Sequence, residues 1–240
     1  MLDFGSVMQK KVSELSVFFP TYNEEGNIGK TVKDAKNVLS KVALRWEIII
    51  VNDGSADKTK EVSEKLARSD KRIRLVNHKI NKGYGGALKT GFDSAKYRWV
   101  AFTDADGQFD FSEIAKFVDK ADSADLILGY RLKRADSLSR KVLTFWWNAL
   151  ARLLLGLPAR DYSCGFKLIR KDVFNKVSPL IGEEKVTQIE MLVKARKLGF
   201  VFDEIGVHHY PRAMGKQTGA NLGVFVKSVL GLFRLWWQLR

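Results

Sequence analysis

The sequence predicts an α/β fold in which helices cover a doubly wound, mostly parallel sheet. Apolar runs rich in β-branched residues alternate with amphipathic stretches, and this alternation is typical of parallel sheets. The expected strands in the first half are SVFF, EIIIV, RIRLV, WVAF and DLILG. We expect Ser55 to cap the helix after the second strand. At 240 residues and 45% hydrophobic content, the chain can bury one complete core.

The pattern changes after Tyr130. A basic loop leads into a Trp-containing helix over 137–157, which is followed by the strand CGFKLIR, another helix and the strand FVFDEIGVHHY. We therefore divide the chain into a flexible N-terminus at 1–12, a main domain at 13–216 and a C-terminal amphipathic helix at 217–240.

The net charge of +14 indicates attraction to something anionic, such as nucleic acid, a nucleotide or lipid. The basic residues gather after the fifth strand: 11 Lys and Arg face 3 Asp between Leu128 and Lys176. The single Cys164 excludes an intrachain disulfide and fits a reducing compartment. Residues 1–12 lack the pattern of a signal peptide.

Two aspartates, Asp104 and Asp106, directly follow the apolar run WVAF. Strands of a parallel sheet open into a binding crevice at their carboxyl ends. Two carboxylates there suit Mg²⁺ or Mn²⁺, with substrate phosphates and water as the remaining ligands. For an Asp-x-Asp taken alone, the alternative is an acidic turn.

Polar residues also follow the first two strands. The first strand ends in PTYNEE at Pro20, and the second delivers Asp53 next to Gly54. A carboxylate at this edge can accept hydrogen bonds from a ribose hydroxyl or a base amine, and glycine permits close backbone approach. Each segment alone also reads as a turn. Three polar strand ends together favour a nucleotide site.

The glycine-rich stretch NKGYGGALKTG, from Asn81 to Gly91, resembles a dinucleotide-binding fingerprint only in part. Leu88 stands where the third glycine of G-x-G-x-x-G belongs. This departure argues against a nicotinamide cofactor. The glycines fit a loop and helix start that pass close to a nucleotide.

The segments PTYNEE, IVNDGSADKT, NKGYGGALKTG and DADGQ, in this order, resemble the family 2 inverting glycosyltransferases. Within that family the chain is similar to polyprenol-phosphate hexose synthases typified by dolichol-phosphate mannose synthase, over about 14–216. The resemblance implies a Rossmann-like GT-A fold with peripheral amphipathic helices, a nucleotide-sugar donor and Mg²⁺ or Mn²⁺. It implies that the metal is met by Asp104, Asp106 and Gln108. It implies that the nucleotide sugar is held by Pro20, Tyr22, Glu24, Val51, Asp53, Asp104, Ala105, Asp106, Arg212 and Lys216.

The same resemblance gives the basic half a role. It implies that Arg131, together with Arg140 and Thr144, binds the phosphate of the acceptor, since guanidinium groups suit phosphate oxygens. Asp161 then organises the acceptor site beside the arginines. If the acceptor were a sugar hydroxyl instead, Asp161 would be the candidate general base.

Two helical segments bear on a membrane. Each has a narrow polar edge and a tandem tryptophan, Trp146-Trp147 and Trp236-Trp237, a residue that favours the headgroup region. Neither reaches the ~18 uninterrupted apolar residues of a spanning helix. We expect peripheral attachment, and the alternative is that one helix completes the core.

The resulting prediction is an inverting enzyme that transfers a hexose, mannose or glucose, from a GDP- or UDP-sugar to a polyprenyl phosphate. Asp104, Asp106, Arg131 and Asp161 are its expected catalytic residues, and the cytoplasmic face of the cell or endoplasmic reticulum membrane is its expected location. One alternative is transfer to a saccharide hydroxyl. The other is a basic module that binds nucleic acid or anionic lipid without catalysis. In the main prediction no nucleic acid is a partner.

Overall fold

The computed structural model describes residues 10–133, 138–156, 159–212, 214–215 and 222–239. Seven strands form one sheet in the order β3-β2-β1-β4-β6-β5-β7, and β6 alone runs antiparallel to its two neighbours. The strands are β1 (Val12–Thr21), β2 (Ala43–Asn52), β3 (Ile73–Asn77), β4 (Trp99–Phe102), β5 (Leu126–Arg131), β6 (Lys167–Arg170) and β7 (Phe202–Val207). All seven expected strands are present, so the predicted α/β class is confirmed.

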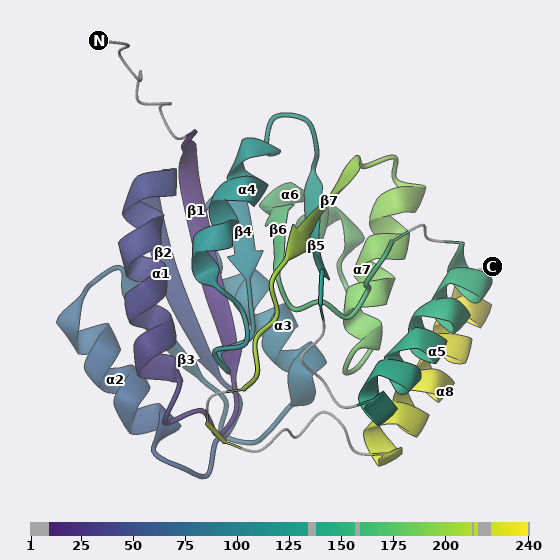
Figure 1. Ribbon diagram of the computed structural model, residues 1–240, viewed down its shortest axis with the longest axis horizontal. Helices are drawn as coiled ribbons and strands as arrows, with labels where there is room; N and C mark the ends of the chain where they lie inside the picture. The colour runs from purple at the N-terminus through teal and green to yellow at the C-terminus, as the bar shows by residue number, and fades with distance from the viewer. Residues whose placement is uncertain (1–9, 134–137, 157–158, 213, 216–221, 240) are drawn as a thin grey trace.

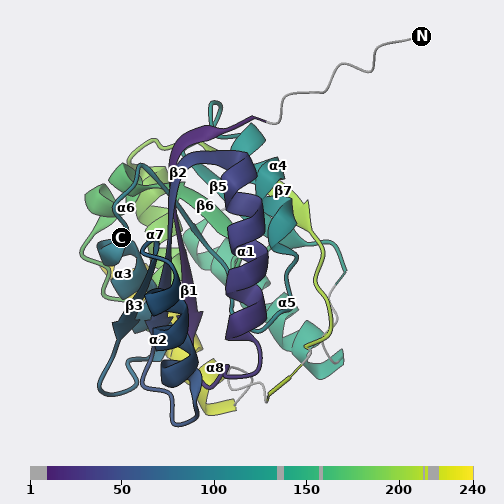
Figure 2. The same ribbon diagram turned by 90° about the vertical axis from the view of Figure 1, so that its left-hand side faces the viewer.

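The described helices cover both faces of this sheet (Figures 1 and 2). On one face lie α1 (Ile28–Val42), α2 (Thr59–Ser69) and α4 (Ile114–Asp119), with the short 3₁₀ turn η1 (Phe111–Glu113). On the other face lie α3 (Gly83–Ser94), α5 (Leu138–Leu155), α6 (Lys171–Val177), α7 (Val186–Lys197) and α8 (Leu222–Gln238).

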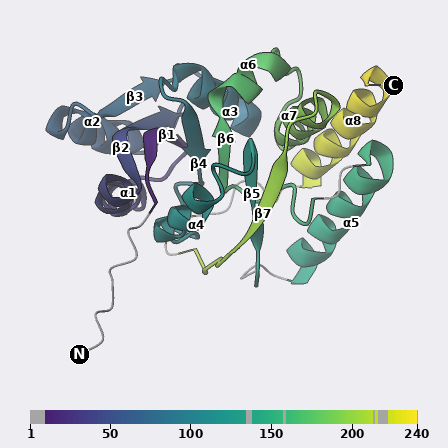
Figure 3. The ribbon, with the colours of Figure 1, turned by 90° about the horizontal axis from the view of Figure 1, so that it is seen from above.

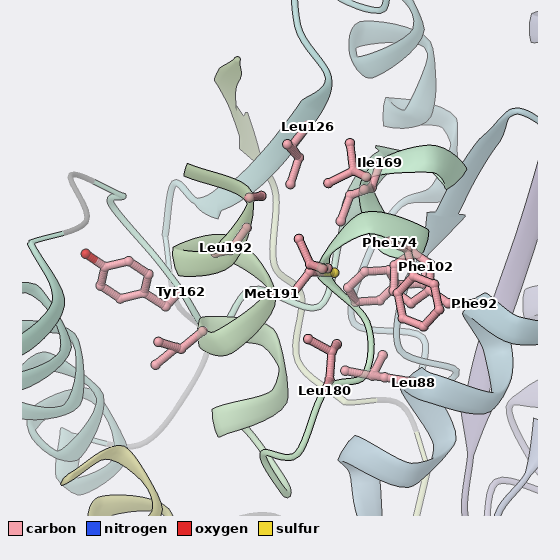
Figure 4. Close-up of a cluster of buried hydrophobic side chains, with 14 of the residues drawn as sticks. Leu88, Phe92, Phe102, Leu126, Tyr162, Ile169, Phe174, Leu180, Met191 and Leu192 are labelled. Carbon is pink, nitrogen blue, oxygen red and sulfur yellow. The ribbon is translucent and has the colours of Figure 1, made fainter. Parts of the chain in front are cut away.

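Alternation along the strands divides the core between these two faces. Phe18 belongs to the core under α3, whereas Phe19 packs under α1, because successive side chains of a strand point to opposite faces. Figure 4 shows part of the first core, where Phe92 stacks on Phe174 with ring centroids 4.6 Å apart. Both cores leave the carboxyl ends of β1, β2 and β4 open, so polar side chains can gather there.

The expected cap at Ser55 is wrong. The helix α2 begins four residues later, and its first turn is satisfied by Asp57, whose carboxylate accepts from the Thr59 backbone N–H at 2.9 Å. Ser55 instead joins the loops after β1 and β2, since its hydroxyl accepts from Asn23 N and donates to Asn52 Oδ1. The serine therefore supports the sheet edge rather than a helix terminus.

Helices α5 and α8 lie side by side at the end of the molecule away from β3 (Figures 1 and 3). Helix α8 buries Leu232 and Leu235 against the fold, so part of it completes the core. Its outer side carries an exposed apolar stripe at helical spacing: Val226, Leu230, Phe233 and Trp237. Its predicted polar edge lines a second cavity, together with residues 181–184: Lys227, Gly231, Arg234 and Gln238.

Helix α5 has a similar outer side. Val142, Trp146 and Leu153 are exposed, whereas the predicted polar edge turns inward at Thr144, which is buried. The tandem tryptophan of this helix does not act as a pair, because Trp146 is 63% exposed and Trp147 is 3% exposed. Among the described residues, none of the helices is long and apolar enough to cross a membrane.

Candidate active site

The carboxyl ends of β1, β2 and β4 open into a cavity of about 350 Å³. Most of the predicted site residues line it: Pro20, Tyr22, Glu24, Asp53, Asp104, Ala105, Asp106, Gln108, Arg131 and Arg212. Val51 does not, because its side chain is fully buried in the core. Thr144 is buried on α5 and does not line the cavity either. Lys216 and the side chain of Arg140 lie outside the described part of the chain.

The β2 end positions Asp53 through two hydrogen bonds. Its Oδ1 atom lies 2.6 Å from His78 Nδ1 and accepts from the Lys82 backbone N–H at 2.8 Å. His78 Nε2 in turn lies 2.9 Å from Thr90 Oγ1. Gly54 adopts φ +68°, and a Cβ there would lie 2.7 Å from the Asn81 nitrogen. The sequence therefore needs glycine beside this carboxylate, which is held from two other loops.

The electrostatics of the cavity are perturbed at Asp106, beside Asp104. Burial, reinforced by the nearby charge of Asp104, raises the pKa of Asp106 to about 7. A backbone N–H from Gln108 reaches Asp106 Oδ1 at 3.0 Å and opposes this rise. The Gln108 side-chain amide donates to the Tyr210 carbonyl at 3.0 Å, which fixes its orientation. The cavity thus holds a desolvated carboxylate, Asp106, whose charge repels that of Asp104.

Arg212 reaches this pair from the segment after β7. Its guanidinium bonds Glu24 Oε1 and lies 3.5 Å from Asp106 Oδ2, while its Nε donates to the Met214 carbonyl at 2.7 Å. Asn27 binds Glu24 Oε2 at 2.7 Å, so the arginine joins the β1 loop to the aspartate pair. Burial raises the pKa of Glu24. A cation therefore spans the mouth of the cavity.

The donor set fits a divalent cation bound together with a substrate. Among the described residues, no cluster of three or more His, Cys, Asp or Glu side chains could enclose a metal alone. Asp104 and Asp106 supply two hard oxygen ligands in a desolvated site, and Mg²⁺ and Mn²⁺ favour such oxygens, completed by phosphates and water. A cation there would also offset the repulsion that raises the Asp106 pKa.

Arg131, the last residue of β5, also lines the cavity. Its Nε and Nη2 donate to the two carboxylate oxygens of Asp161 at 2.7 and 2.9 Å, and both side chains are buried. Nη2 also donates to Ser163 Oγ at 3.0 Å. The predicted pairing of Asp161 with an arginine is thus present, and Asp161 lies behind Arg131 rather than on the cavity wall.

Sequence reasoning missed several lining residues. Tyr84 donates to Asp104 Oδ1 at 3.1 Å, and Gln188 donates to the Tyr84 hydroxyl at 3.3 Å. Glu184, Lys185 and Asn81 also line the cavity. Asn81 and Tyr84 lie within the glycine-rich stretch, where the glycines alone drew notice, and no motif marks Glu184, Lys185 or Gln188, which come from α7 and the loop before it. The available signal was Gln188 and Glu190, two polar residues within the apolar centre of a helix.

Comparison with known proteins identifies the class. The family described as Glycosyl transferase family 2 matches residues 16–178. The chain belongs to this family and is a glycosyltransferase. Glucosyl-3-phosphoglycerate synthase from Mycobacterium tuberculosis has the same fold, with a TM-score of 0.71 at 18% identity, covering 93% of this chain and 80% of that one. The predicted GT-A fold is therefore confirmed.

Three relatives place the chain more closely. Dolichyl-phosphate beta-glucosyltransferase of Saccharomyces cerevisiae is 30% identical over 90% of this chain and 71% of that protein. Dodecaprenyl-phosphate galacturonate synthase of Rhizobium johnstonii is 31% identical over 84% of this chain and 60% of that protein. Glycosyltransferase AglD of Haloferax volcanii is 32% identical over 94% of this chain, which spans only 37% of that protein.

Proposed function

We propose that this chain transfers a hexose, with inversion, from a nucleotide-diphosphate sugar to a polyprenyl phosphate. The observation that carries the proposal is a cavity lined both by the Asp104–Asp106 pair with Arg212 and by Arg131. The aspartate pair and Arg212 suit a metal-bound diphosphate, and Arg131 presents a buried guanidinium to a second anion. The names of two relatives, a dolichyl-phosphate glucosyltransferase and a dodecaprenyl-phosphate galacturonate synthase, support this assignment.

On the donor side, Asp53 and the β1 loop at Pro20–Glu24 face the nucleoside, and Asp104, Asp106 and Gln108 face the diphosphate. Mg²⁺ or Mn²⁺ bound there would neutralise the charge that develops on the departing diphosphate. Arg212 lies 3.5 Å from Asp106, so its guanidinium is within reach of the same phosphates. An incoming phosphate can compete with Glu24 for the Arg212 guanidinium.

On the acceptor side, a phosphate oxygen of the lipid attacks the anomeric carbon. The bond from that carbon to the diphosphate breaks, and its electron pair leaves with the nucleoside diphosphate. A phosphate monoester is already ionised near neutral pH, so this step needs no general base. Asp161 fits that scheme, because both of its oxygens accept from Arg131 and hold the guanidinium in place. A saccharide acceptor with Asp161 as base is the second candidate, and the bidentate ion pair disfavours it.

The outer sides of α5 and α8 support a location at a membrane surface. A helix in water normally buries its apolar side, yet α5 exposes Val142, Trp146 and Leu153 and buries Thr144. The exposed stripe of α8 lies on the neighbouring helix. Apolar area, tryptophan and a net charge of +14 together favour an anionic lipid surface. We assign this surface to the cytoplasmic side, where nucleotide sugars and a reduced Cys164 are expected.

A thermal-shift panel of UDP- and GDP-hexoses with Mn²⁺ tests the donor, because a ligand of the folded state raises the melting temperature by mass action. The sugar that shifts it most is then supplied with a short polyprenyl phosphate, with the free polyprenol and with a saccharide. We expect transfer to the phosphate alone. Transfer to the saccharide would support the second candidate, and no turnover of any nucleotide sugar would support a binding module.

A further inference from the structure

A chain of hydrogen bonds runs beneath the cavity from the middle of the sheet to Asp104. Lys167 on β6 donates to the side-chain oxygen of Gln188 on α7. Gln188 Nε2 donates to the Tyr84 hydroxyl at 3.3 Å, and that hydroxyl donates to Asp104 Oδ1 at 3.1 Å. Lys167 is 0% exposed and Gln188 is 2% exposed, so the inner part of this hydrogen-bond chain is shielded from water.

The donors and acceptors of each group fix the direction in which the hydrogen bonds of this series run. The ammonium of Lys167 has only donors, and its three hydrogen bonds go to the carbonyls of Tyr162 and Cys164 and to Gln188. The Gln188 oxygen must therefore face Lys167, which turns its NH₂ group toward Tyr84. The Tyr84 oxygen accepts there, and its single proton is left for the carboxylate of Asp104. One buried cation thus sets the orientation of two polar side chains.

The backbone before β6 also confines Asp104. A Cβ at Gly165 would lie 2.4 Å from Asp104 Oδ2, so the backbone of the segment before β6 fits closely against the carboxylate. Oδ1 accepts a hydrogen bond from Tyr84. The carboxylate therefore lies between a donated hydrogen bond and a glycine backbone, which leaves it little freedom to rotate.

A purely structural role does not account for Lys167. Burying an ammonium is costly, and a methionine would fill the same space without that cost. The side chain is held by neutral oxygens of the protein and lies over the Phe102 ring at 5.6 Å. Its distinctive consequence is the fixed direction of the hydrogen bonds that lead to Asp104.

We propose that Lys167, Gln188 and Tyr84 are positioning residues that orient Asp104 toward the divalent cation of a nucleoside diphosphate. The inference rests on the proposed function, because it assigns the metal to the aspartate pair. Outer hydrogen-bond partners of metal ligands fix ligand orientation, and their loss commonly weakens metal binding ~10–100-fold. We call the hydrogen-bonded series Lys167–Gln188–Tyr84 the relay. It supplies such a partner through three side chains from three different elements.

Three variants separate the relay from general destabilisation. Tyr84→Phe removes only the hydroxyl. Gln188→Glu keeps the size and the contact with Lys167 but cannot donate to Tyr84, so the tyrosine proton is drawn away from Asp104. Lys167→Met removes the cation that sets the direction. Tyr97→Phe is the matched control, because Tyr97 is also half-buried but lies outside the cavity.

The measurement is Mn²⁺ binding to the full chain with uridine diphosphate, followed by electron paramagnetic resonance, with a melting curve for each variant. We expect Tyr84→Phe and Gln188→Glu to weaken Mn²⁺ binding ~10-fold or more and Tyr97→Phe to leave it unchanged. If Lys167→Met does not fold, the other two variants decide. Wild-type Mn²⁺ affinity in folded Tyr84→Phe and Gln188→Glu overturns the relay, as does the absence of Mn²⁺ binding by the wild-type chain. Sugar transfer by the wild-type chain tests the proposed function separately.

Discussion

The residues that we assign to the donor and those that we assign to the acceptor, called the donor side and the acceptor side below, are held in different ways. On the donor side, carboxylates stand directly after buried strands, and backbone N–H groups of neighbouring residues or loops hold them, as Gln108 holds Asp106 and Lys82 holds Asp53. On the acceptor side, a long cationic side chain, Arg131, is held by one buried carboxylate, Asp161. Backbone N–H groups thus help to position the proposed donor carboxylates, whereas Arg131 is positioned through a bidentate ion pair with Asp161.

This difference has a thermodynamic consequence. Short carboxylates on strand ends lose little conformational entropy when a ligand binds, because they are already fixed. A buried ion pair is different: removing either partner leaves an uncompensated charge, which costs ~3–5 kcal/mol. Substitutions on the donor side should therefore change chemistry with little loss of stability, whereas those at Arg131 or Asp161 should change both.

The largest expected effect is at the aspartate pair. Asp106→Asn removes one hard anionic ligand and weakens stabilisation of the leaving group, so we expect turnover to fall ~100-fold or more. The melting temperature without ligand should not fall, since the substitution also relieves repulsion from Asp104. Steady-state transfer assays with and without chelator measure the effect, with Asp93→Asn, an exposed residue of α3, as control. Unchanged, chelator-resistant transfer by Asp106→Asn would contradict the metal assignment.

The same difference explains what could be predicted from the sequence. The strands and the carboxylates after them follow from local pattern, because a parallel sheet brings its strand ends to one edge. Tyr84 and Gln188 could not be found this way, since their position depends on how α3 and α7 pack together. The inward turn of Thr144 and the burial of Trp147 also come from tertiary packing. Helical spacing in the sequence shows that a helix has an apolar stripe and a polar stripe. Tertiary packing decides which of the two is buried.

The second prediction tests the acceptor side. Arg131→Ala should raise the KM for the lipid phosphate ~10-fold or more, because a charge-assisted, forked contact is lost. It should also lower the melting temperature, since Asp161 loses its partner. Arg131→Lys keeps the charge but not the fork, and should rescue stability better than acceptor binding.

Asp161→Asn is the comparison variant. If Asp161 only holds Arg131, the substitution should destabilise the chain and shift the acceptor KM, with a milder loss of kcat than Arg131→Ala causes. If Asp161 is a general base for a saccharide, kcat should instead fall ~100-fold or more and the saccharide should be the better acceptor. We would measure kcat and KM of both variants with each acceptor. Whether the substitution mainly changes KM or mainly changes kcat then separates these cases.

A smaller effect is expected at the outer stripes of α5 and α8. Leu230→Ser with Trp237→Ser should weaken binding to anionic liposomes several-fold, because apolar area and charge act together at a lipid surface. Binding should also fall with salt without vanishing. Leu198→Ser, exposed at the end of α7, is the matched control. Flotation of the double variant at the wild-type level would argue against these helices as the membrane surface, and donor binding should be normal in every variant.

The smallest and most specific prediction compares one outer hydrogen bond on each side. Ser163→Ala removes a contact to the Arg131 guanidinium, and Thr90→Val removes the contact to His78, which holds Asp53. Each loss costs ~1 kcal/mol or less at its site, because single hydrogen bonds contribute about that much. We therefore expect Ser163→Ala to raise the acceptor KM ~2–5-fold with the donor KM unchanged, and Thr90→Val to do the reverse. Steady-state kinetics with each substrate varied in turn measure both constants. If each variant shifts both constants equally, the two sides are coupled through the fold, and the division into a donor side and an acceptor side is wrong.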